Sequence, residues 1–404
     1  MINIIIAHTE NGDVELRCNQ LISDGSYVVT DNTRVIDLLN IFLEIYVADI
    51  SVRSSGIYPR HLQVEAYVDS ENIEVWKQNI SWIKKLAEFV TEGDGDRWHI
   101  ILQPVEYEFE AQQLSFTEFK ADNVSLLSGG LDSFCGAYQN EIQNCNTLYC
   151  GYKTSNVDTS AINGVSSFLN GRRGNLGIRT YSKVIKKKET LTQRTRSLLF
   201  FSLAVMTAVR EGIEIVNINE NGIMTLNPSF QSRGTTKTTH PKTIYMYQTI
   251  LDNVGIRVKL NHPFLFMTKG EMVNGLSVEY KEHIADTRSC SRSMHDRRYD
   301  VSARKSCGTC VPCLLRKISM AAYDLEQYDN EYDVPYEGNM EDDEYRSALN
   351  YYTTFYQYIK SGEIFSELVM KRKYYHVEDY YEKTFEMLKK FSAEFEVFIK
   401  KYGG

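Results

Sequence analysis

The sequence predicts an α/β protein whose core is a doubly wound parallel sheet, and three observations support this fold class. Between Asp122 and about Leu325, short apolar runs alternate with loops and with stretches of helical length. Such alternation is typical of parallel strands joined by crossover helices. The residues before it favour short strands between turns, and those after it favour helices. We therefore expect an α+β module at 1–120, the sheet domain at 121–328, and an acidic linker with a helical C-terminal region at 329–404.

In the N-terminal module, turn residues such as Asn11-Gly12 separate short apolar runs. The expected strands are Asn3–Ala7, Val14–Arg17, His61–Val68 and His99–Tyr107, and the expected helices are Asp37–Val47 and Val75–Val90. The module carries no motif with a chemical meaning, so the sequence leaves its purpose open.

In the sheet domain, strands and helices follow one another with short connections. The expected strands are Val124–Leu127, Thr147–Tyr152, Gly177–Val184, Glu214–Ile218 and Ile256–Leu260. The expected helices are Leu131–Gln139, Thr195–Arg210 and Lys269–Tyr280.

The C-terminal region begins with a run of acidic residues from Asp329 to Glu344 and continues as helix rich in tyrosine. Its apolar side chains recur every three or four residues at Phe385, Leu388, Phe391, Phe395 and Phe398. This spacing makes one apolar helix face, which we interpret as packing rather than as a cofactor site.

Composition restricts the classes of function. The chain has 404 residues, a net charge of −8 and 43% hydrophobic residues, as expected of a globular protein with a sizeable core. A surface that wraps nucleic acid needs a basic face, so we expect no direct nucleic-acid binding. The longest apolar stretch, Ser197–Val209, is shorter than the roughly 18–20 residues of a membrane span, and the first residues do not resemble a signal peptide. We therefore expect a soluble, cytoplasmic protein without a membrane partner.

The strongest motif is Ser128-Gly129-Gly130-Leu131-Asp132-Ser133, directly after an expected strand and before an expected helix. Two glycines let backbone N–H groups approach an anion, and the helix adds its positive N-terminal end. The hydroxyls of Ser128 and Ser133 can donate to phosphate oxygens, and Asp132 can cap the turn or hold Mg²⁺. The alternative is a plain glycine turn capped by Asp132 and Ser133.

Four cysteines lie close together late in the chain. Cys307, Cys310 and Cys313 form two consecutive C-x-x-C spacings, and sixteen residues separate Cys290 from Cys307. Four thiolates suit tetrahedral Zn²⁺ in a closed structural site, so we predict a zinc loop at 290–313. A redox C-x-x-C pair and a fortuitous cluster are the alternatives, and His295 could substitute for one thiolate.

The motif at 128–133 resembles the SGGxDS signature of the PP-loop pyrophosphatases. That resemblance implies an adenine nucleotide α-hydrolase-like fold, ATP as cofactor, and cleavage of ATP between the α and β phosphates with transfer of AMP. The additional pattern C…C-x-x-C-x-x-C, followed by Leu315-Arg316-Lys317, is similar to the 7-cyano-7-deazaguanine synthase (QueC) family. The likeness covers about half of the chain, and the gap after Cys290 is longer than in that family.

Three further segments carry candidate residues. Arg196, with Arg194 as a second candidate, looks like the family's helix start that faces the nucleotide. Lys269, after Pro263, resembles a family lysine that would stabilise leaving pyrophosphate or polarise the carboxylate. Glu220 and Asn221 follow a strand at its carboxyl end, where they could read the amide edge of a guanine-like base. Ordinary helix-start and turn residues are the alternative interpretation of all three segments.

The segment Asn227–His240 departs from the family pattern. Only Arg233 aligns plausibly with the expected deazapurine-binding stretch, so we expect a rebuilt substrate pocket that uses Arg233 and His240. Extended QueC-like proteins with an extra N-terminal module resemble those of antiphage defence operons of the Qat and CBASS types. There the implied chemistry stops at an amide formed with a partner protein's amine.

Three functions remain from the sequence. The first is a ligase that adenylates 7-carboxy-7-deazaguanine and transfers the activated deazaguanine to a partner protein's amine in antiviral defence. The second is a synthase that makes the free nitrile from ammonia, as in queuosine biosynthesis. The third is a non-catalytic ATP sensor. The sequence leaves the oligomeric state open, with a homodimer as one option.

Overall fold

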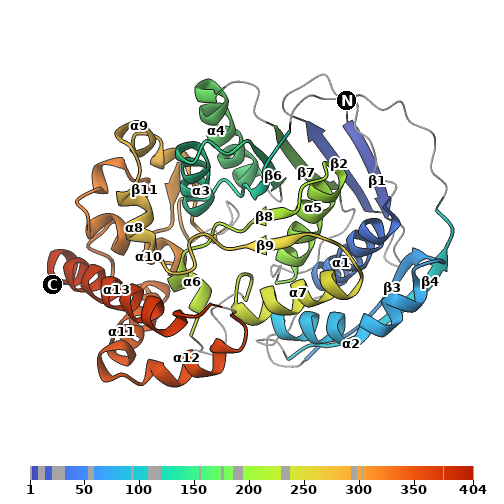
Figure 1. Ribbon diagram of the computed structural model, residues 1–404. Helices are drawn as coiled ribbons and strands as arrows, with labels where there is room; N and C mark the ends of the chain where they lie inside the picture. Colours follow the sequence, from blue (N-terminus) through green and yellow to red (C-terminus); the bar gives the residue numbers. More distant parts are fainter. Residues whose placement is uncertain are drawn as a thin grey trace.

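The computed structural model describes residues 2–7, 14–20, 32–52, 59–91, 95–107, 120–153, 156–173, 177–184, 194–228, 237–292, 298–302, 304–375 and 377–403. A seven-stranded sheet in the order β1-β2-β7-β6-β5-β8-β9 forms its centre (Figure 1). The strands of this sheet are β1 (Ile2–Ala7), β2 (Val14–Gln20), β5 (Asn123–Leu126), β6 (Thr147–Lys153), β7 (Ile178–Val184), β8 (Ile215–Asn217) and β9 (Lys259–Asn261). The strands β5 to β9 are parallel, whereas β1 and β2 add an antiparallel edge through the pairing of β2 with β7.

The order of the parallel strands reverses at β5. The chain runs from β5 through β6 to β7 on one side and then crosses to β8 and β9 on the other. In sheets of this kind, the crevice outside the carboxyl ends of the strands at the reversal is where ligands bind. The carboxyl ends of β5 and β8 are therefore the place where a site is expected.

Helices cover both faces of the sheet. They are α1 (Thr33–Ser51), α2 (Ile73–Val90), α3 (Leu131–Ile142), α4 (Asn156–Arg173), α5 (Arg196–Arg210), α6 (Gly222–Leu226), α7 (Pro241–Asn253), α8 (Lys269–Asn274), α9 (Val278–Lys281), α10 (Val311–Ala321), α11 (Asp343–Ser361), α12 (Ile364–Arg372) and α13 (Tyr380–Tyr402), with 3₁₀ turns at Ile284–Asp286 and Glu326–Tyr328. On β6, Leu148 and Cys150 face a core shared with α1, α5 and α7, whereas Tyr149 faces a core shared with α3 and α4. This alternation is the two-residue period of a strand buried on both faces.

Two smaller parallel pairs accompany the central sheet. The strands β3 (His61–Asp69) and β4 (Arg97–Val105) pair with each other and pack with α1 and α2, at the opposite side of the molecule from the C-terminal helices in Figure 1. The strands β10 (Lys305–Ser306) and β11 (Glu331–Tyr332) pair beside the cysteines. No helix in the described ranges is long and apolar enough to cross a membrane.

The mixed α/β fold with parallel sheets and a helical C-terminal tail confirms the coarse prediction from the sequence. The helix expected at Lys269–Tyr280 is wrong as a single element, because α8 ends at Asn274 with Gly275 as its C-cap, and the hydroxyl of Ser277 caps the separate α9. Residues 1–120 contribute β1 and β2 to the central sheet, and α1 packs directly on α5. The acidic stretch after Asp329 is packed against the cysteine region, where Asp329 forms a buried ion pair with Arg316.

Candidate active site and metal centre

The loop between β5 and α3 needs glycine because other backbone segments approach it closely. Gly129 has a φ of +74°, and a Cβ there would lie 2.7 Å from the backbone nitrogen of Ile162. The carbonyl oxygen of Gly129 accepts a hydrogen bond from the backbone N–H of Arg288 at 2.9 Å. The tight turn is therefore fixed both by α4 and by the segment that leads to Cys290.

Two hydroxyl groups lie side by side at this loop. Ser128 Oγ and Ser133 Oγ are 3.2 Å apart, Gly130 N–H donates to Ser128 Oγ at 3.2 Å, and Ser133 Oγ donates to the Gly130 carbonyl at 2.9 Å. The loop opens into the N-terminus of α3, whose positive end favours anions. The arrangement can therefore offer hydroxyl and backbone donors to phosphate oxygens.

Asp132 is the centre of a buried charge cluster assembled from three segments. It lies in the first turn of α3 and forms an ion pair with Lys269, the first residue of α8. Its other oxygen accepts a hydrogen bond of 2.8 Å from the side-chain amide of Asn221, which caps α6 after β8. Both Asp132 and Lys269 expose less than a tenth of their surface. The cluster therefore joins the carboxyl ends of β5 and β8 to the segment after β9.

A second carboxyl group adjoins this ion pair. Asn221 Nδ2 also donates to Glu220 Oε1 at 3.1 Å. Burial raises the pKa of Glu220 well above its ordinary value, and the negative charge of Asp132 is the second largest cause. Burial alone would also favour neutral Asp132, but Lys269 and hydrogen bonds from Glu220 and Asn221 lower the pKa of Asp132 to about 2. The cluster therefore holds one carboxylate, one ammonium group and one carboxyl that retains its proton.

His262 supports the backbone of this cluster. Its Nε2 lies 2.8 Å from the Glu220 carbonyl oxygen, to which it donates, and 3.3 Å from the hydroxyl of Thr225. Burial lowers the pKa of His262 to about 4, so the ring is neutral near pH 7. A neutral ring adds no charge beside Lys269, and its role here is to hold the Glu220 backbone.

The C-terminal helix α13 reaches the start of α8. Thr268 caps α8 together with Glu271, and the Thr268 hydroxyl also donates to Glu394 of α13. A Cβ at Gly270 would lie 2.4 Å from Glu394 Oε1, so glycine is needed for this approach. Burial raises the pKa of Glu394 to about 8. The helical tail therefore helps to fix the backbone that carries Lys269.

The N-terminal region holds the start of α5 in a similar way. The carboxylate of Asp49 on α1 accepts hydrogen bonds from the backbone and the hydroxyl of Thr195 at 3.0 and 2.9 Å. Arg60 forms buried ion pairs with Asp49 and Asp96. Arg196, which follows Thr195, is exposed and is the first residue of α5. A side chain from α1 thus supplies the cap that α5 lacks from its own residues.

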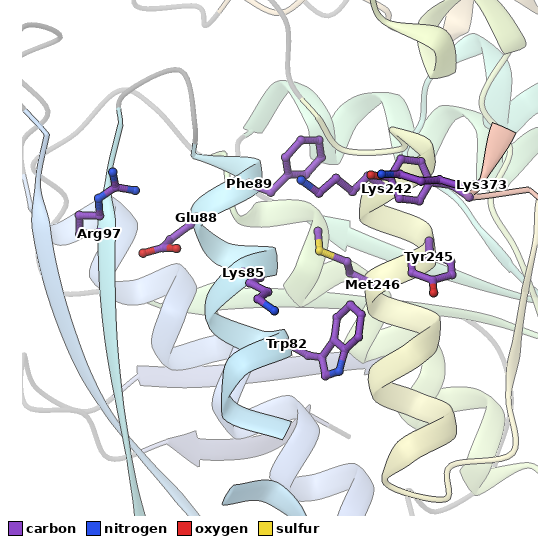
Figure 2. A pocket seen from close by; sticks show the side chains of 10 residues that line it. Trp82, Lys85, Glu88, Phe89, Arg97, Lys242, Tyr245, Met246 and Lys373 are labelled. Atoms are coloured by element: carbon purple, nitrogen blue, oxygen red, sulfur yellow. The ribbon is translucent and has the colours of Figure 1, made fainter. Parts of the chain in front are cut away.

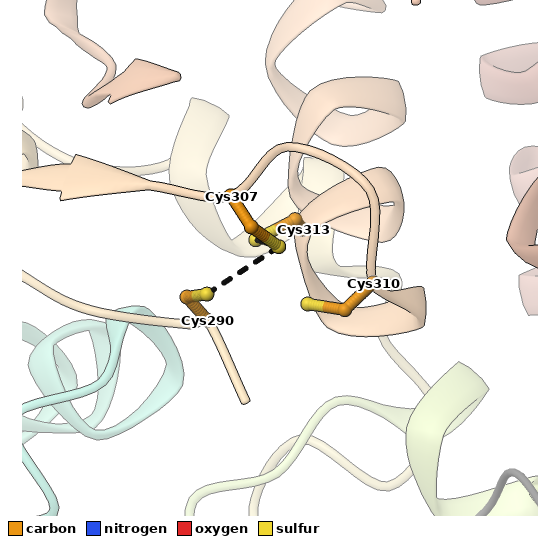
Figure 3. Close-up of side chains that lie close together, drawn as sticks. All are labelled: Cys290, Cys307, Cys310 and Cys313. Atoms are coloured by element: carbon orange, nitrogen blue, oxygen red, sulfur yellow. Dashed lines mark hydrogen bonds between the residues drawn. The ribbon is translucent and has the colours of Figure 1, made fainter. Parts of the chain in front are cut away.

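The four cysteines form one compact cluster (Figure 3). Their sulfur atoms all lie within 4.8 Å of one another, with 3.6 Å from Cys290 to Cys307 and 3.9 Å from Cys307 to Cys313. Tetrahedral zinc with bonds of about 2.3 Å places sulfurs about 3.8 Å apart, so the donor set fits this ion. Cys290 is half-buried and the other three are buried. The group could therefore hold a metal ion such as zinc.

Backbone geometry arranges these thiols. Gly308 has a φ of +79°, and a Cβ there would lie 2.1 Å from the Val334 carbonyl oxygen. The N–H groups of Arg292 and Thr309 donate to the sulfurs of Cys290 and Cys307, both at 3.4 Å. Such donors stabilise thiolates, which are the form that binds a metal.

Buried cations behind the cysteines connect them to the glycine turn at 128–133. Lys317 donates to three carbonyl oxygens, including that of Gly308 at 2.9 Å. Arg316 donates to Thr287 and pairs with Asp329, and the backbone of the neighbouring Arg288 binds Gly129. The basic pair after the cysteines is therefore internal support, and a continuous set of contacts runs from the metal ligands to the glycine turn.

The structure brings together most, but not all, of the residues predicted for the site. The loop at 128–133, Glu220, Asn221 and Lys269 converge at one edge of the sheet. His240 lies in another neighbourhood, where its Nδ1 caps α7 and its ring packs on Phe89. Arg233 and His295 lie outside the described residues.

Sequence reasoning missed three residues that support the site. Asp49 is one of three buried acidic residues on α1, and Glu394 lies among the buried aromatic residues of α13. An acidic residue within an apolar stretch is a signal that could have been used. His262 follows β9 directly and carries no comparable signal.

No family model matches the sequence, and no curated protein matches it.

Proposed function

We propose that this protein is an ATP-dependent enzyme that activates a carboxylate as an acyl adenylate and then transfers the acyl group to an amine. The observation that carries the proposal is the meeting of the glycine turn at 128–133 with the Asp132–Lys269–Glu220 cluster at the strand reversal. A glycine turn at a helix N-terminus with a buried ammonium group nearby suits cleavage of a polyphosphate.

In the proposed first step, a carboxylate oxygen of the substrate attacks the α-phosphorus of ATP. A new oxygen–phosphorus bond forms while the bond to the β-phosphate bridge breaks, and pyrophosphate leaves with the electron pair. The hydroxyls of Ser128 and Ser133 and the backbone of the loop hold the leaving pyrophosphate. Lys269 offsets the negative charge that develops in the transition state.

The carboxyl pair of Asp132 and Glu220 fits a magnesium ion that would accompany ATP. Glu220 retains its proton because the single ammonium group of Lys269 does not offset two buried carboxylates. A divalent cation held by these oxygens would supply the missing positive charge and screen the triphosphate.

In the proposed second step, an amine attacks the acyl carbon and AMP leaves with the bonding electron pair, while the amine's proton passes to solvent. We propose 7-carboxy-7-deazaguanine as the carboxylate, on the resemblance to the QueC family. We propose a partner protein as the source of the amine, because the chain carries two regions beyond the sheet domain and departs from the family between Asn227 and His240.

Mass spectrometry of the zinc-loaded protein tests the proposal, with ATP, Mg²⁺, 7-carboxy-7-deazaguanine and ammonium as reactants. We expect AMP with bound adenylate or simple amide, and no nitrile. Formation of AMP together with 7-cyano-7-deazaguanine at good turnover would instead indicate a synthase, and it would overturn the proposal that a partner protein supplies the amine. Asp132→Ala should abolish AMP formation, whereas an ATP sensor without turnover would give no AMP with either protein.

A further inference from the structure

A pocket lies between α2 and α7, and none of its lining residues belongs to the cluster around Asp132. Its volume is about 540 Å³, which is within the usual range for small-molecule sites. Figure 2 shows Trp82 and Phe89 on α2 opposite Tyr245 and Met246 on α7. Lys373 and Tyr374, just after α12, close another side. Three regions far apart in the sequence therefore meet around one cavity.

The lining combines aromatic rings with positive charge. The ring centroids of Trp82 and Tyr245 are 6.4 Å apart, and those of Tyr245 and Tyr374 are 5.5 Å apart. Four lining residues are cationic, and the carboxylate of Glu88 is the one acidic group among them; the cations are Lys85, Arg97, Lys242 and Lys373. A protein with a net charge of −8 thus concentrates positive charge at this position.

The cations cover faces of the rings. Lys85 Nζ lies 5.5 Å from the ring centroid of Trp82, and Lys242 Nζ lies 4.4 Å from that of Phe89. Lys373 Nζ lies 5.0 Å from the ring of Tyr374. An anion in the pocket would attract these ammonium groups more strongly than a ring does, and their movement would uncover ring faces for a planar group.

We infer that this pocket binds a nucleoside phosphate, with the base among the rings of Trp82, Tyr245 and Tyr374 and the phosphate among the lysines. A ligand of this class offers both the anion and the planar ring that the lining accommodates. The site does not depend on the proposed adenylation, because none of its lining residues belongs to the cluster around Asp132.

Trp82 provides a built-in reporter. The chain has three tryptophans, and Trp76 and Trp98 are buried away from the pocket, where they donate to Asp37 and Thr91. We expect AMP to quench Trp82 fluorescence in the full-length protein with a saturable dependence. Adenosine, which lacks the anion, and pyrophosphate, an anion that lacks the base, should each bind at least about tenfold more weakly than AMP. Trp82→Phe should lose the fluorescence signal, which would assign the quenching to this residue.

Native mass spectrometry separates this site from the phosphate loop by counting bound AMP. The number of AMP molecules bound per chain is compared between wild type and the double variant Lys242→Gln/Lys373→Gln. The double variant should bind one AMP fewer. The control Lys77→Gln changes an exposed lysine of α2 that pairs with Glu74 and should bind as wild type does. If the glycine turn at 128–133 binds no AMP, which would speak against the proposed adenylation, the wild-type protein should still bind one AMP and the double variant none.

Three results would overturn the inference. The first is equal AMP stoichiometry in wild type and in the double variant. The second is quenching by pyrophosphate as strong as by AMP, which would mean a purely electrostatic surface. The third is quenching of Trp82 fluorescence by an acidic, tyrosine-containing peptide but not by AMP. This result would assign the pocket to a protein segment.

Discussion

The cysteine cluster and the Asp132 cluster are built in opposite ways. Three of the four thiols come from one short stretch, Cys307 to Cys313, whose local turns bring them together. In contrast, Asp132, Glu220 and Lys269 follow different strands, and the two residues of the ion pair lie 137 positions apart in the sequence. The first site, which could hold a metal ion, depends on local geometry, whereas the second depends on the whole sheet.

The largest effect should follow loss of the metal. Cys313→Ser should abolish zinc binding and lower the unfolding temperature by more than about 10 °C, because structural zinc contributes about 10–16 kcal/mol in small domains. Elemental analysis should find one zinc per wild-type chain. The control Cys145→Ser changes a thiol outside the cluster and should keep both zinc and stability. Full zinc occupancy in Cys313→Ser would contradict the structural role.

The next effect should follow removal of the buried ammonium group. Lys269→Met leaves Asp132 and Glu220 without a cation, so the free energy of unfolding should fall by about 3–5 kcal/mol. The control Lys390→Met breaks an exposed pair with Glu271 and should cost less than about 1 kcal/mol. Denaturant titration measures both, and equal losses would mean that the Asp132 cluster is not a connected unit.

These two clusters also differ in how far they could be predicted from the sequence. Spacing alone identified the four cysteines, and the strand–turn–helix context placed the loop at 128–133, because both depend on neighbouring residues. The pairing of Asp132 with Lys269 could not be predicted, since it requires the strand order. The break after α8 at Gly275 was missed because apolar spacing continues through it.

A pH-dependent effect should follow from Glu394. Its pKa is about 8 in the folded protein against 4.5 when exposed, so the unfolded chain loses this proton first. The group's contribution to stability should therefore fall by about 2–4 kcal/mol as pH rises from about 4.5 to about 8. The groups that face it are Thr268, Tyr323, Glu271 and Lys390. Chemical denaturation across this range should show the decline in wild type but not in Glu394→Gln, and the same decline in both would contradict it.

The smallest effect should come from the glycine turn. Gly129→Ala combines a φ of +74° with a close approach to Ile162 and should cost about 1–3 kcal/mol. Gly171→Ala in α4 meets no atom within 4 Å and should stabilise by up to about 1 kcal/mol. Thermal unfolding compares the two, and similar shifts would show that the turn tolerates side chains.

Carboxylate-dependent exchange of labelled pyrophosphate into ATP tests the central claim most directly, because exchange requires reversible formation of an adenylate. With Mg²⁺ and 7-carboxy-7-deazaguanine, we predict exchange by the wild-type protein and none by Asp132→Asn or Lys269→Met. Release of inorganic phosphate without exchange, or exchange that persists in both variants, would contradict the assignment of this cluster as an adenylating site.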